Sequence, residues 1–195
     1  CATGAQTIVI GLEAIRQGLS DVVVCCATQT LDIVNLIEFT LLEALSTYND
    51  DPQKASRPFD LTRNGFVISE GAGALILESK RHALKRNAKI YAEICGSGIT
   101  NDSYRLTDPH PEGKYAALAI KKAMEDSGLK MDDIDYINAH ATSTVANDRS
   151  ETNAIKQVFG NYSSKIKING SKSILGHMLL AAGIIEKIID TSRKF

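Results

Sequence analysis

Short runs of β-branched and other apolar residues alternate with amphipathic segments along this chain, and that alternation limits the folds it can adopt. Runs of strand length occupy residues 21–27, 66–78, 91–100, 135–138 and 165–169. Segments with a helical spacing of apolar residues lie between most of them. Strands that alternate with helices usually include parallel pairs covered by those helices, so the sequence predicts an α/β fold with some parallel pairing. The carboxyl ends of such strands commonly present catalytic side chains.

The predicted helices have recognisable ends. Residues 2–18 combine apolar residues at helical spacing with a final glycine, which predicts a buried helix with Gly18 as its C-cap and Cys1 at its amino end. Further helices are expected around residues 34–45, 79–86, 114–127 and 148–159. Gly128 should end the helix over residues 114–127.

Proline and glycine mark the irregular parts of the chain. Residues 46–64 contain Pro52 and Pro58 and show little periodicity, so an ordered loop is expected there. Gly71 and Gly73 interrupt a predicted strand, which indicates that another backbone approaches it closely.

Composition argues against several classes of function. With 22 basic and 23 acidic residues, the formal net charge of −1 argues against an extended nucleic-acid surface. The four cysteines show neither C-x-x-C nor histidine-pair spacing, so no disulfide framework, zinc site or other metal site is expected. The longest apolar stretches are much shorter than a bilayer span, and no signal peptide is recognisable.

A basic run at residues 80–86 allows two interpretations. Its cations are Lys80, Arg81, Lys85 and Arg86, with His82 among them. Such a run offers a local contact for an acidic partner, but a solvated helix face is the favoured interpretation.

Three short motifs carry the reactive side chains. They are Cys1-Ala2-Thr3-Gly4, Asn138-Ala139-His140-Ala141-Thr142-Ser143-Thr144 and Ser171-Lys172-Ser173-Ile174-Leu175-Gly176-His177. A thiol reacts as its thiolate, which the positive end of a helix dipole and the free N–H groups of a first turn stabilise. A thiol at a helix start, two histidines and a lysine together predict an acyl-transfer site.

These motifs resemble the elongating β-ketoacyl-acyl-carrier-protein synthases, the condensing enzymes of fatty-acid synthesis, and the likeness runs from Cys1 to about Ile189. Other matching segments are Ala44-Leu45-Ser46, Ser56-Arg57-Pro58-Phe59-Asp60, Asn64-Gly65-Phe66-Val67, Glu70-Gly71-Ala72-Gly73-Ala74, Ile90-Tyr91-Ala92-Glu93 and Ala181-Ala182-Gly183 with Glu186. Any one of these motifs would be a weak signal, whereas so many in order identify the family. Ala141 stands where many bacterial members have glycine. In this respect the chain resembles the mitochondrial branch of the family.

The resemblance implies a thiolase-like fold, in which two similar halves stack as alternating helical and sheet layers, α/β/α/β/α. This chain is expected to hold the end of the first half and most of the second. It would form a single partial domain over residues 1–195, with about as much chain again before Cys1 in the family.

The resemblance also implies roles for individual residues. Cys1 would take up the acyl chain as a thioester and be regenerated by the condensation. His140 and His177 would donate hydrogen bonds to the malonyl thioester carbonyl as negative charge develops on its oxygen during decarboxylation. Which histidine also moves a proton stays open.

Three further roles follow from the resemblance. Lys172 would lie beside the histidines as a buried cation, the alternative being an exposed loop lysine. Glu186 is its expected partner, because a buried charge must be paired. Thr142 and Thr144 would contact the amides of the pantetheine arm, unless they are plain turn residues.

The implied activity is that of a 3-oxoacyl-acyl-carrier-protein synthase, an acyltransferase that performs decarboxylative Claisen condensation of malonyl-carrier protein with an acyl thioester. The expected partners are an acyl carrier protein, whose phosphopantetheine carries the substrates without a further cofactor, and a second copy in a homodimer. A mitochondrial location is expected, with a cytoplasmic one as the alternative. The competing interpretation is an inactive truncated chain or a partner subunit, although such subunits in this family typically lack the nucleophile.

Overall fold

Glycine ends the first helix where the sequence predicts it. In the computed structural model of this chain, which describes residues 1–192, helix α1 spans Thr3–Arg16 and Gly18 follows it with a φ of 72°. The N–H groups of Gly18 and Leu19 donate to the carbonyls of Ile15 and Ala14. This pair of hydrogen bonds is the Schellman ending that a glycine in the left-handed region permits.

Helix α1 buries one face rather than its whole surface. Ile8 and Leu12, one turn apart, are buried, whereas Ile10 on the opposite side is 62% exposed. The prediction of a buried helix therefore holds for one face only, because packing in the described residues covers one stripe of the helix.

Two compact units form, each from non-contiguous segments of the chain. Unit 1 comprises Cys1–Asp32, Ile68–Ile94 and the segment that begins at His177, and unit 2 comprises Ile33–Val67 and Cys95–Gly176. The expectation of one partial domain over the whole chain stays a prediction.

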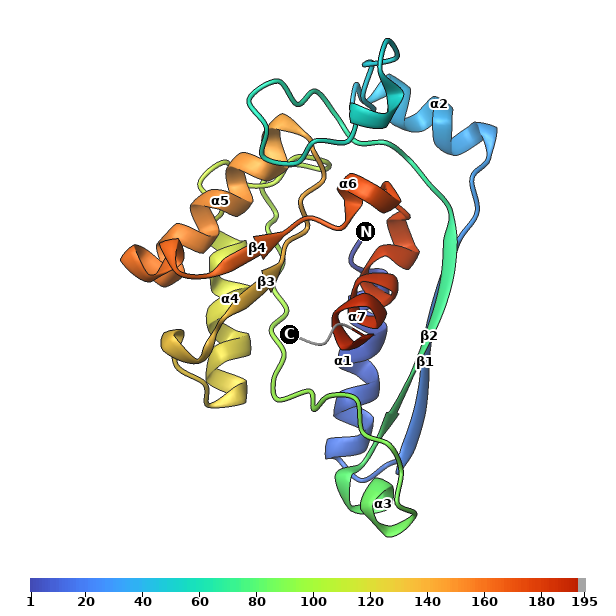
Figure 1. Cartoon of the computed structure of the whole chain (residues 1–195), viewed down its shortest axis with the longest axis vertical. Coiled ribbons are helices and arrows are strands. Elements are labelled where there is room, and N and C mark those ends of the chain that lie inside the picture. Colours follow the sequence, from blue (N-terminus) through green and yellow to red (C-terminus); the bar gives the residue numbers. More distant parts are fainter. Residues whose placement is uncertain (193–195) are drawn as a thin grey trace. The chain divides into compact units, whose positions relative to one another are not determined.

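The core of unit 1 lies between an antiparallel sheet and two helices (Figure 1). Strand β1 (Val22–Gln29) pairs with β2 (Gly71–Glu78), with Val22 opposite Glu78. Helices α1 and α7 (Ala182–Ser192) pack against this sheet through Ile8, Cys25 and Ile184, with Val23, Ala27, Leu75, Leu77 and Ile188 around them. The alternation of the strands thus turns one set of side chains towards the helices.

Gly73 and Gly71 lie where another segment approaches strand β2 closely, but the atoms that approach belong to side chains and not to a backbone. A Cβ at Gly73 would lie 2.8 Å from Cγ2 of Ile184, and one at Gly71 would lie 2.6 Å from Sδ of Met178. The expectation of a neighbouring backbone is thus corrected, because the bulky side chains of α7 and of the segment before it fill the space above β2.

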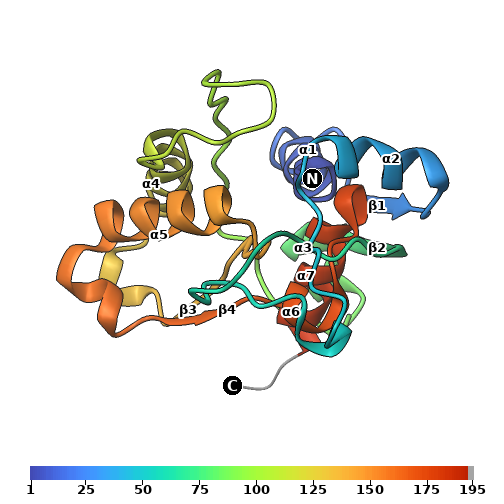
Figure 2. The same cartoon turned by 90° about the horizontal axis from the view of Figure 1, so that it is seen from above.

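The core of unit 2 lies between two helices and a parallel pair of strands. Strand β3 (Tyr136–Asn138) pairs in parallel with β4 (Lys167–Asn169), which confirms the predicted parallel pairing. Ile155, Phe159 and Ile166 form the core, with Ile120, Met124, Ile134, Ile137, Val158 and Tyr162 around them. Helices α4 and α5 lie side by side in both views (Figures 1 and 2).

The remaining elements follow the predicted order closely. Helix α4 spans Lys114–Ser127 and ends at Gly128 with a φ of 70°, as predicted. The other helices are α2 (Ile33–Leu41), α3 (Lys80–Lys85), α5 (Val145–Phe159) and α6 (Lys172–Leu175). Short 3₁₀ turns lie at Pro52–Lys54, Met131–Asp133, Gly160–Ser164 and Leu179–Ala181.

One predicted strand does not form. In the part of the chain that the structure describes, residues 91–100 carry no regular secondary structure and pair with no strand. Gly96 and Gly98 lie instead against helix α4, where a Cβ at Gly98 would sit 2.1 Å from the carbonyl oxygen of Ala119. The backbone of this apolar segment therefore packs on a helix, and among the described residues no β-ladder of hydrogen bonds stabilises it as a strand.

Among residues 1–192, none of the helices combines the length and the apolar character that crossing a membrane requires.

Candidate active site

Cys1 precedes the start of helix α1, as predicted. It is exposed, and the N-cap of the helix is the next residue, Ala2. An alanine N-cap has no side-chain acceptor for the first-turn N–H groups, and the first turn holds no acidic residue. The positive end of the helix therefore stays available to stabilise an anion such as the Cys1 thiolate.

Backbone hydrogen bonds hold His177 in unit 1. The carbonyl of His177 accepts a hydrogen bond of 3.0 Å from the N–H of Ser69, beside a parallel bridge to Ile68. The N–H of Leu179 donates to Nδ1 of His177 at 3.1 Å. Because Nδ1 acts as the acceptor, a neutral His177 carries its proton on Nε2, which makes Nε2 the hydrogen-bond donor of this ring.

Cys1 and His177 lie together in unit 1. The sulfur of Cys1 and a ring nitrogen of His177 are within 4.8 Å of each other. His177 is 2% exposed, so its ring is removed from bulk water while the thiol is accessible. A nucleophilic sulfur beside a buried N–H donor can form a thioester and have a charged oxygen stabilised nearby.

His140 follows strand β3 in unit 2, where the sequence predicts it. The N–H of Ala139 continues the ladder by donating to the carbonyl of Asn169 at 2.8 Å. The carboxylate of Glu151 then accepts from the N–H of His140 at 2.6 Å and from that of Ala141 at 2.8 Å. The half-buried side chain of Glu151 thus holds the backbone turn from which the imidazole projects.

Glu151 is a functional candidate that the sequence interpretation missed. Burial raises the pKa of its carboxyl, whereas the hydrogen bonds from Ala141 and His140 lower that pKa. The raised pKa shows that desolvation outweighs those bonds. Its place in the first two turns of a predicted helix, directly after the histidine motif, is the signal by which it could have been found.

Lys172 meets His140 through the backbone. Lys172 is 2% exposed, so the alternative of an exposed loop lysine is wrong. Its ammonium donates to the carbonyl of His140 at 2.8 Å, and its own carbonyl accepts from the hydroxyl of Ser56 at 2.7 Å. The structure therefore brings together the predicted His140 and Lys172 within unit 2.

Glu186 lies on α7 in unit 1, where its side chain is half-buried. Its pairing with Lys172 stays a prediction.

Thr142 and Thr144 interact with each other. Their Oγ1 atoms are 2.9 Å apart, and Thr142 is buried. Thr144 is also the N-cap of α5, since its hydroxyl accepts from the N–H of Asn147 at 3.2 Å. These contacts give both residues a structural role, and their contact with a pantetheine arm stays a prediction.

Asp148 anchors the loop that precedes α5, and the sequence interpretation missed it too. Its buried carboxylate accepts from the N–H groups of Phe59 and Ser143 and lies 3.4 Å from Nε of Arg63. Arg63 in turn donates to the carbonyls of Thr144 and Val145. These contacts fasten the predicted ordered loop to the histidine motif.

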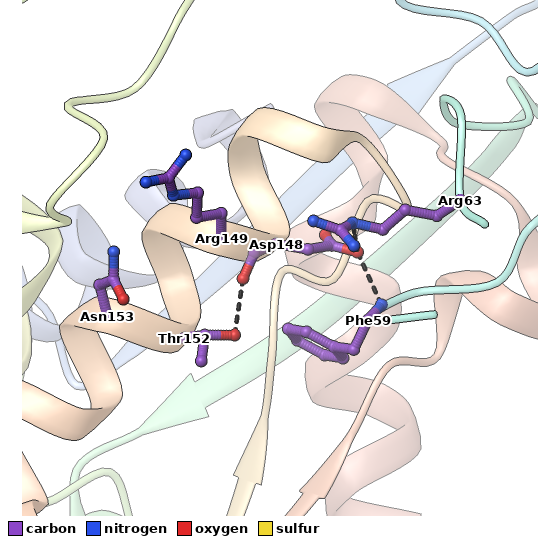
Figure 3. A pocket seen from close by; sticks show the side chains of 6 residues that line it. All are labelled: Phe59, Arg63, Asp148, Arg149, Thr152 and Asn153. Atoms are coloured by element: carbon purple, nitrogen blue, oxygen red, sulfur yellow. Dashed lines mark hydrogen bonds and ion pairs between the residues drawn. The ribbon is translucent and has the colours of Figure 1, made fainter. Parts of the chain in front are cut away.

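A pocket of about 230 Å³ opens beside this anchor (Figure 3). It is lined by Phe59, Arg63, Asp148, Arg149, Thr152 and Asn153. The bonds from Phe59 to Asp148 and from Thr152 to the Asp148 carbonyl form part of its wall. None of the residues predicted to react lines it.

The basic run at α3 is largely balanced by acidic residues of unit 1. Lys80 pairs with Glu93 and Arg81 with Asp21. His82 and Arg86 both contact Glu78. These pairs support the solvated helix face over a surface for an acidic partner.

The family models that match the chain cover nearly all of it. Residues 1–83 match the N-terminal domain of beta-ketoacyl synthase, and residues 91–190 match its C-terminal domain. The mitochondrial 3-oxoacyl-[acyl-carrier-protein] synthase of Arabidopsis thaliana is 46% identical over 97% of this chain and 42% of its own length. The 3-oxoacyl-[acyl-carrier-protein] synthase 2 of Synechocystis sp. is 45% identical over 96% of this chain and 45% of its own length.

Comparison with solved structures also matches the chain to ketosynthases. A beta-ketoacyl synthase from Burkholderia phymatum superposes with a TM-score of 0.92 at 37% identity, over 98% of this chain and 46% of that one. A ketosynthase solved with its type II PKS acyl-carrier protein superposes with a TM-score of 0.96 at 41% identity, over 98% of this chain and 47% of that one. The similarity shows the thiolase-like ketosynthase fold, and the chain spans less than half the length of these relatives.

Proposed function

Because the chain belongs to the β-ketoacyl synthase family, we propose that it supplies the nucleophile and the histidines of a 3-oxoacyl-acyl-carrier-protein synthase. The reaction would extend a fatty acyl chain by decarboxylative Claisen condensation. The observation that carries the proposal is the Cys1 sulfur within 4.8 Å of a nitrogen of the buried His177, whose Nδ1 already accepts a backbone hydrogen bond.

The first step is transfer of the acyl chain. The Cys1 thiolate attacks the acyl thioester of the carrier protein, and the carrier thiolate leaves and takes up a proton. The amino end of α1 favours the thiolate before this attack.

The second step needs hydrogen-bond donors. Malonyl-carrier protein loses CO₂, and the electron pair of the broken C–C bond moves onto the thioester carbonyl as an enolate. The Nε2–H of His177 and the ring of His140 stabilise that oxygen. The enolate carbon then attacks the acyl-Cys1 carbonyl, and the thiolate of Cys1 leaves.

Four further residues assist in this proposal. Lys172 holds the carbonyl of His140 and supplies a buried positive charge, with Glu186 as the partner of that charge. Thr142 and Thr144 receive the pantetheine arm through their hydroxyls.

The partners are proposed from the relatives. An acyl carrier protein delivers both substrates on its phosphopantetheine, with no other cofactor, as the names of the relatives and one neighbouring complex suggest. A homodimer is also proposed. A mitochondrial location is supported by one relative from Arabidopsis thaliana, while others are chloroplastic or from a cyanobacterium. A non-catalytic partner subunit is disfavoured, because Cys1 is present.

Mass spectrometry tests the nucleophile directly. The purified chain is offered a medium-chain acyl-carrier protein, and the intact mass and peptide map locate any acyl group. We expect a single adduct on Cys1, which the Cys1→Ser variant abolishes. Cys26→Ser is the matched control, because Cys26 is likewise exposed but lies on strand β1. Loading that persists in Cys1→Ser, or a folded wild-type chain that takes up no acyl group, would contradict the proposal.

A further inference from the structure

Ala141 and Gly170 are an unusual pair. The backbone of Ala141 has a conformation that favours glycine, whereas the backbone of Gly170 has one that other residues can adopt. Ala141 has a φ of 47°, in the left-handed region where a Cβ is unfavourable, and it is 0% exposed. Gly170 has a φ outside that region, so its own backbone would accept a side chain. A methyl group is present where the backbone disfavours it and absent where the backbone permits it.

Space explains the arrangement. A Cβ at Gly170 would lie 2.7 Å from the Cβ of Ala141 and 3.4 Å from Cβ and Cγ of Pro58. Real Cβ atoms essentially never approach closer than 3.0 Å, and ordinary contacts lie at 3.4–4 Å. The gap between the two segments therefore holds one methyl group, and Ala141 supplies it.

These two segments carry the proposed His140 and Lys172. Ala141 directly follows His140 and donates its N–H to Glu151 at 2.8 Å. Gly170 follows the end of strand β4 and precedes the turn that starts α6 at Lys172. The ammonium of Lys172 spans the two segments by its 2.8 Å bond to the His140 carbonyl.

We propose that Ala141 and Gly170 are positioning residues, and that the methyl group between them sets the separation of the His140 turn from the Lys172 segment. Neither residue touches the substrate in this account. The expected effect of this methyl group on decarboxylation rests on the proposed function, whereas its expected effect on the position of His140 does not.

The proposal makes a reciprocal prediction. Gly170→Ala places two methyl groups in the space of one, so the segments must separate by several tenths of an ångström or more. A misplacement of about 1 Å in a catalytic group can cost about 10²-fold in rate. Ala141→Gly removes the only methyl group and should have a smaller effect. The exchange variant Ala141→Gly/Gly170→Ala moves the methyl group to the other side and should restore the separation.

Four proteins test this: the wild-type chain, both single variants and the exchange variant. The readouts are thermal unfolding, acyl loading of Cys1, decarboxylation of a malonyl-carrier protein, and the NMR signal of the His140 ring, assigned by a His140→Gln variant. Gly170→Ala should lower decarboxylation about 10²-fold. It should spare loading of Cys1 and shift the His140 ring signal, and the exchange variant should recover both the rate and the signal.

Gly128→Ala is the control for replacing a glycine. Gly128 has a φ of 70°, and a Cβ there would have no neighbouring segment within 4 Å, so this variant strains a backbone without crowding a neighbour. It should lower thermal stability and leave the His140 signal unchanged.

The outcomes separate the two proposals. If the wild-type chain neither loads nor decarboxylates, the proposed function fails, and the His140 signal still tests the pair. An unchanged signal in folded Gly170→Ala, or an exchange variant that folds but restores neither signal nor rate, overturns the positioning role.

Discussion

At the scale of the residue, the polar backbone groups of His140 are both held by charged side chains. The carboxylate of Glu151 accepts a hydrogen bond from the N–H of His140, and the ammonium of Lys172 donates one to the carbonyl of His140. Charged partners make stronger hydrogen bonds than neutral ones, so they fix the backbone firmly. The structure therefore supports a function in which the backbone that carries the His140 imidazole must stay in place.

Glu151→Ala tests that support. The variant leaves the N–H groups of His140 and Ala141 without their carboxylate acceptor, and a buried unsatisfied donor costs about 1–3 kcal/mol. Because burial raises the pKa of Glu151, removing its charge also relieves a desolvation cost, so we expect a net loss of about 1–3 kcal/mol and not twice that. Urea unfolding measures this free energy. Glu125→Ala, an exposed glutamate on α4, is the control and should change it little.

At the scale of the element, the sequence predicts helix bounds well, because helical spacing and a terminal glycine act within a few residues of each other. The bounds of α4 and its end at Gly128 follow from helical spacing and one glycine, both visible in the sequence. Residues 91–100 were predicted as a strand and are not one, because a strand needs a paired neighbour that spacing cannot supply. The reactive residues followed from motifs, whereas Glu151 and Asp148 act through backbone N–H groups and leave no such pattern.

The junction of β2 and α3 makes a pH-dependent prediction. Glu78, the last residue of β2, accepts from Arg86 at 2.7 and 2.6 Å and lies 2.5 Å from Nδ1 of His82. Arg86, and then His82, lower the pKa of Glu78 to about 2 from an ordinary 4.5. A lowered acid pKa stabilises the fold above pH 4.5, and that contribution disappears as the pH falls towards 2.

Melting temperatures of the wild-type chain and of Glu78→Gln, recorded from pH 6 to pH 2, check this. The wild-type chain should be the more stable above the ordinary pKa, and the difference should shrink steadily on acidification. A difference that does not change with pH would show that Glu78 contributes by shape alone and not by charge.

At the scale of the whole molecule, apolar surface should govern behaviour in solution. The face of the β1–β2 sheet turned away from α1 and α7 carries Val24, which is 63% exposed, opposite Ile76, which is 67% exposed. Helix α2 buries none of its residues and exposes Ile33, Val34, Ile37 and Leu41. Neighbouring exposed apolar residues on the sheet face, and separately those on α2, favour association, and within residues 1–192 strand β1 pairs on one edge only, with β2.

We therefore expect the purified chain to associate in a concentration-dependent manner, with a light-scattering mass above the 21.1 kDa of one chain. The double variant Val24→Thr/Ile76→Thr keeps residues that suit a strand but removes apolar surface, so its mass should fall towards that of a monomer. Ile10→Thr is the matched control, because Ile10 is 62% exposed but lies on α1, away from the sheet face. If the control lowers the mass as much as the double variant does, association follows general surface hydrophobicity and the sheet face has no special part in it. A wild-type chain that stays at 21.1 kDa at every concentration and melts cooperatively would contradict the prediction altogether, because its exposed face would then be tolerated in water.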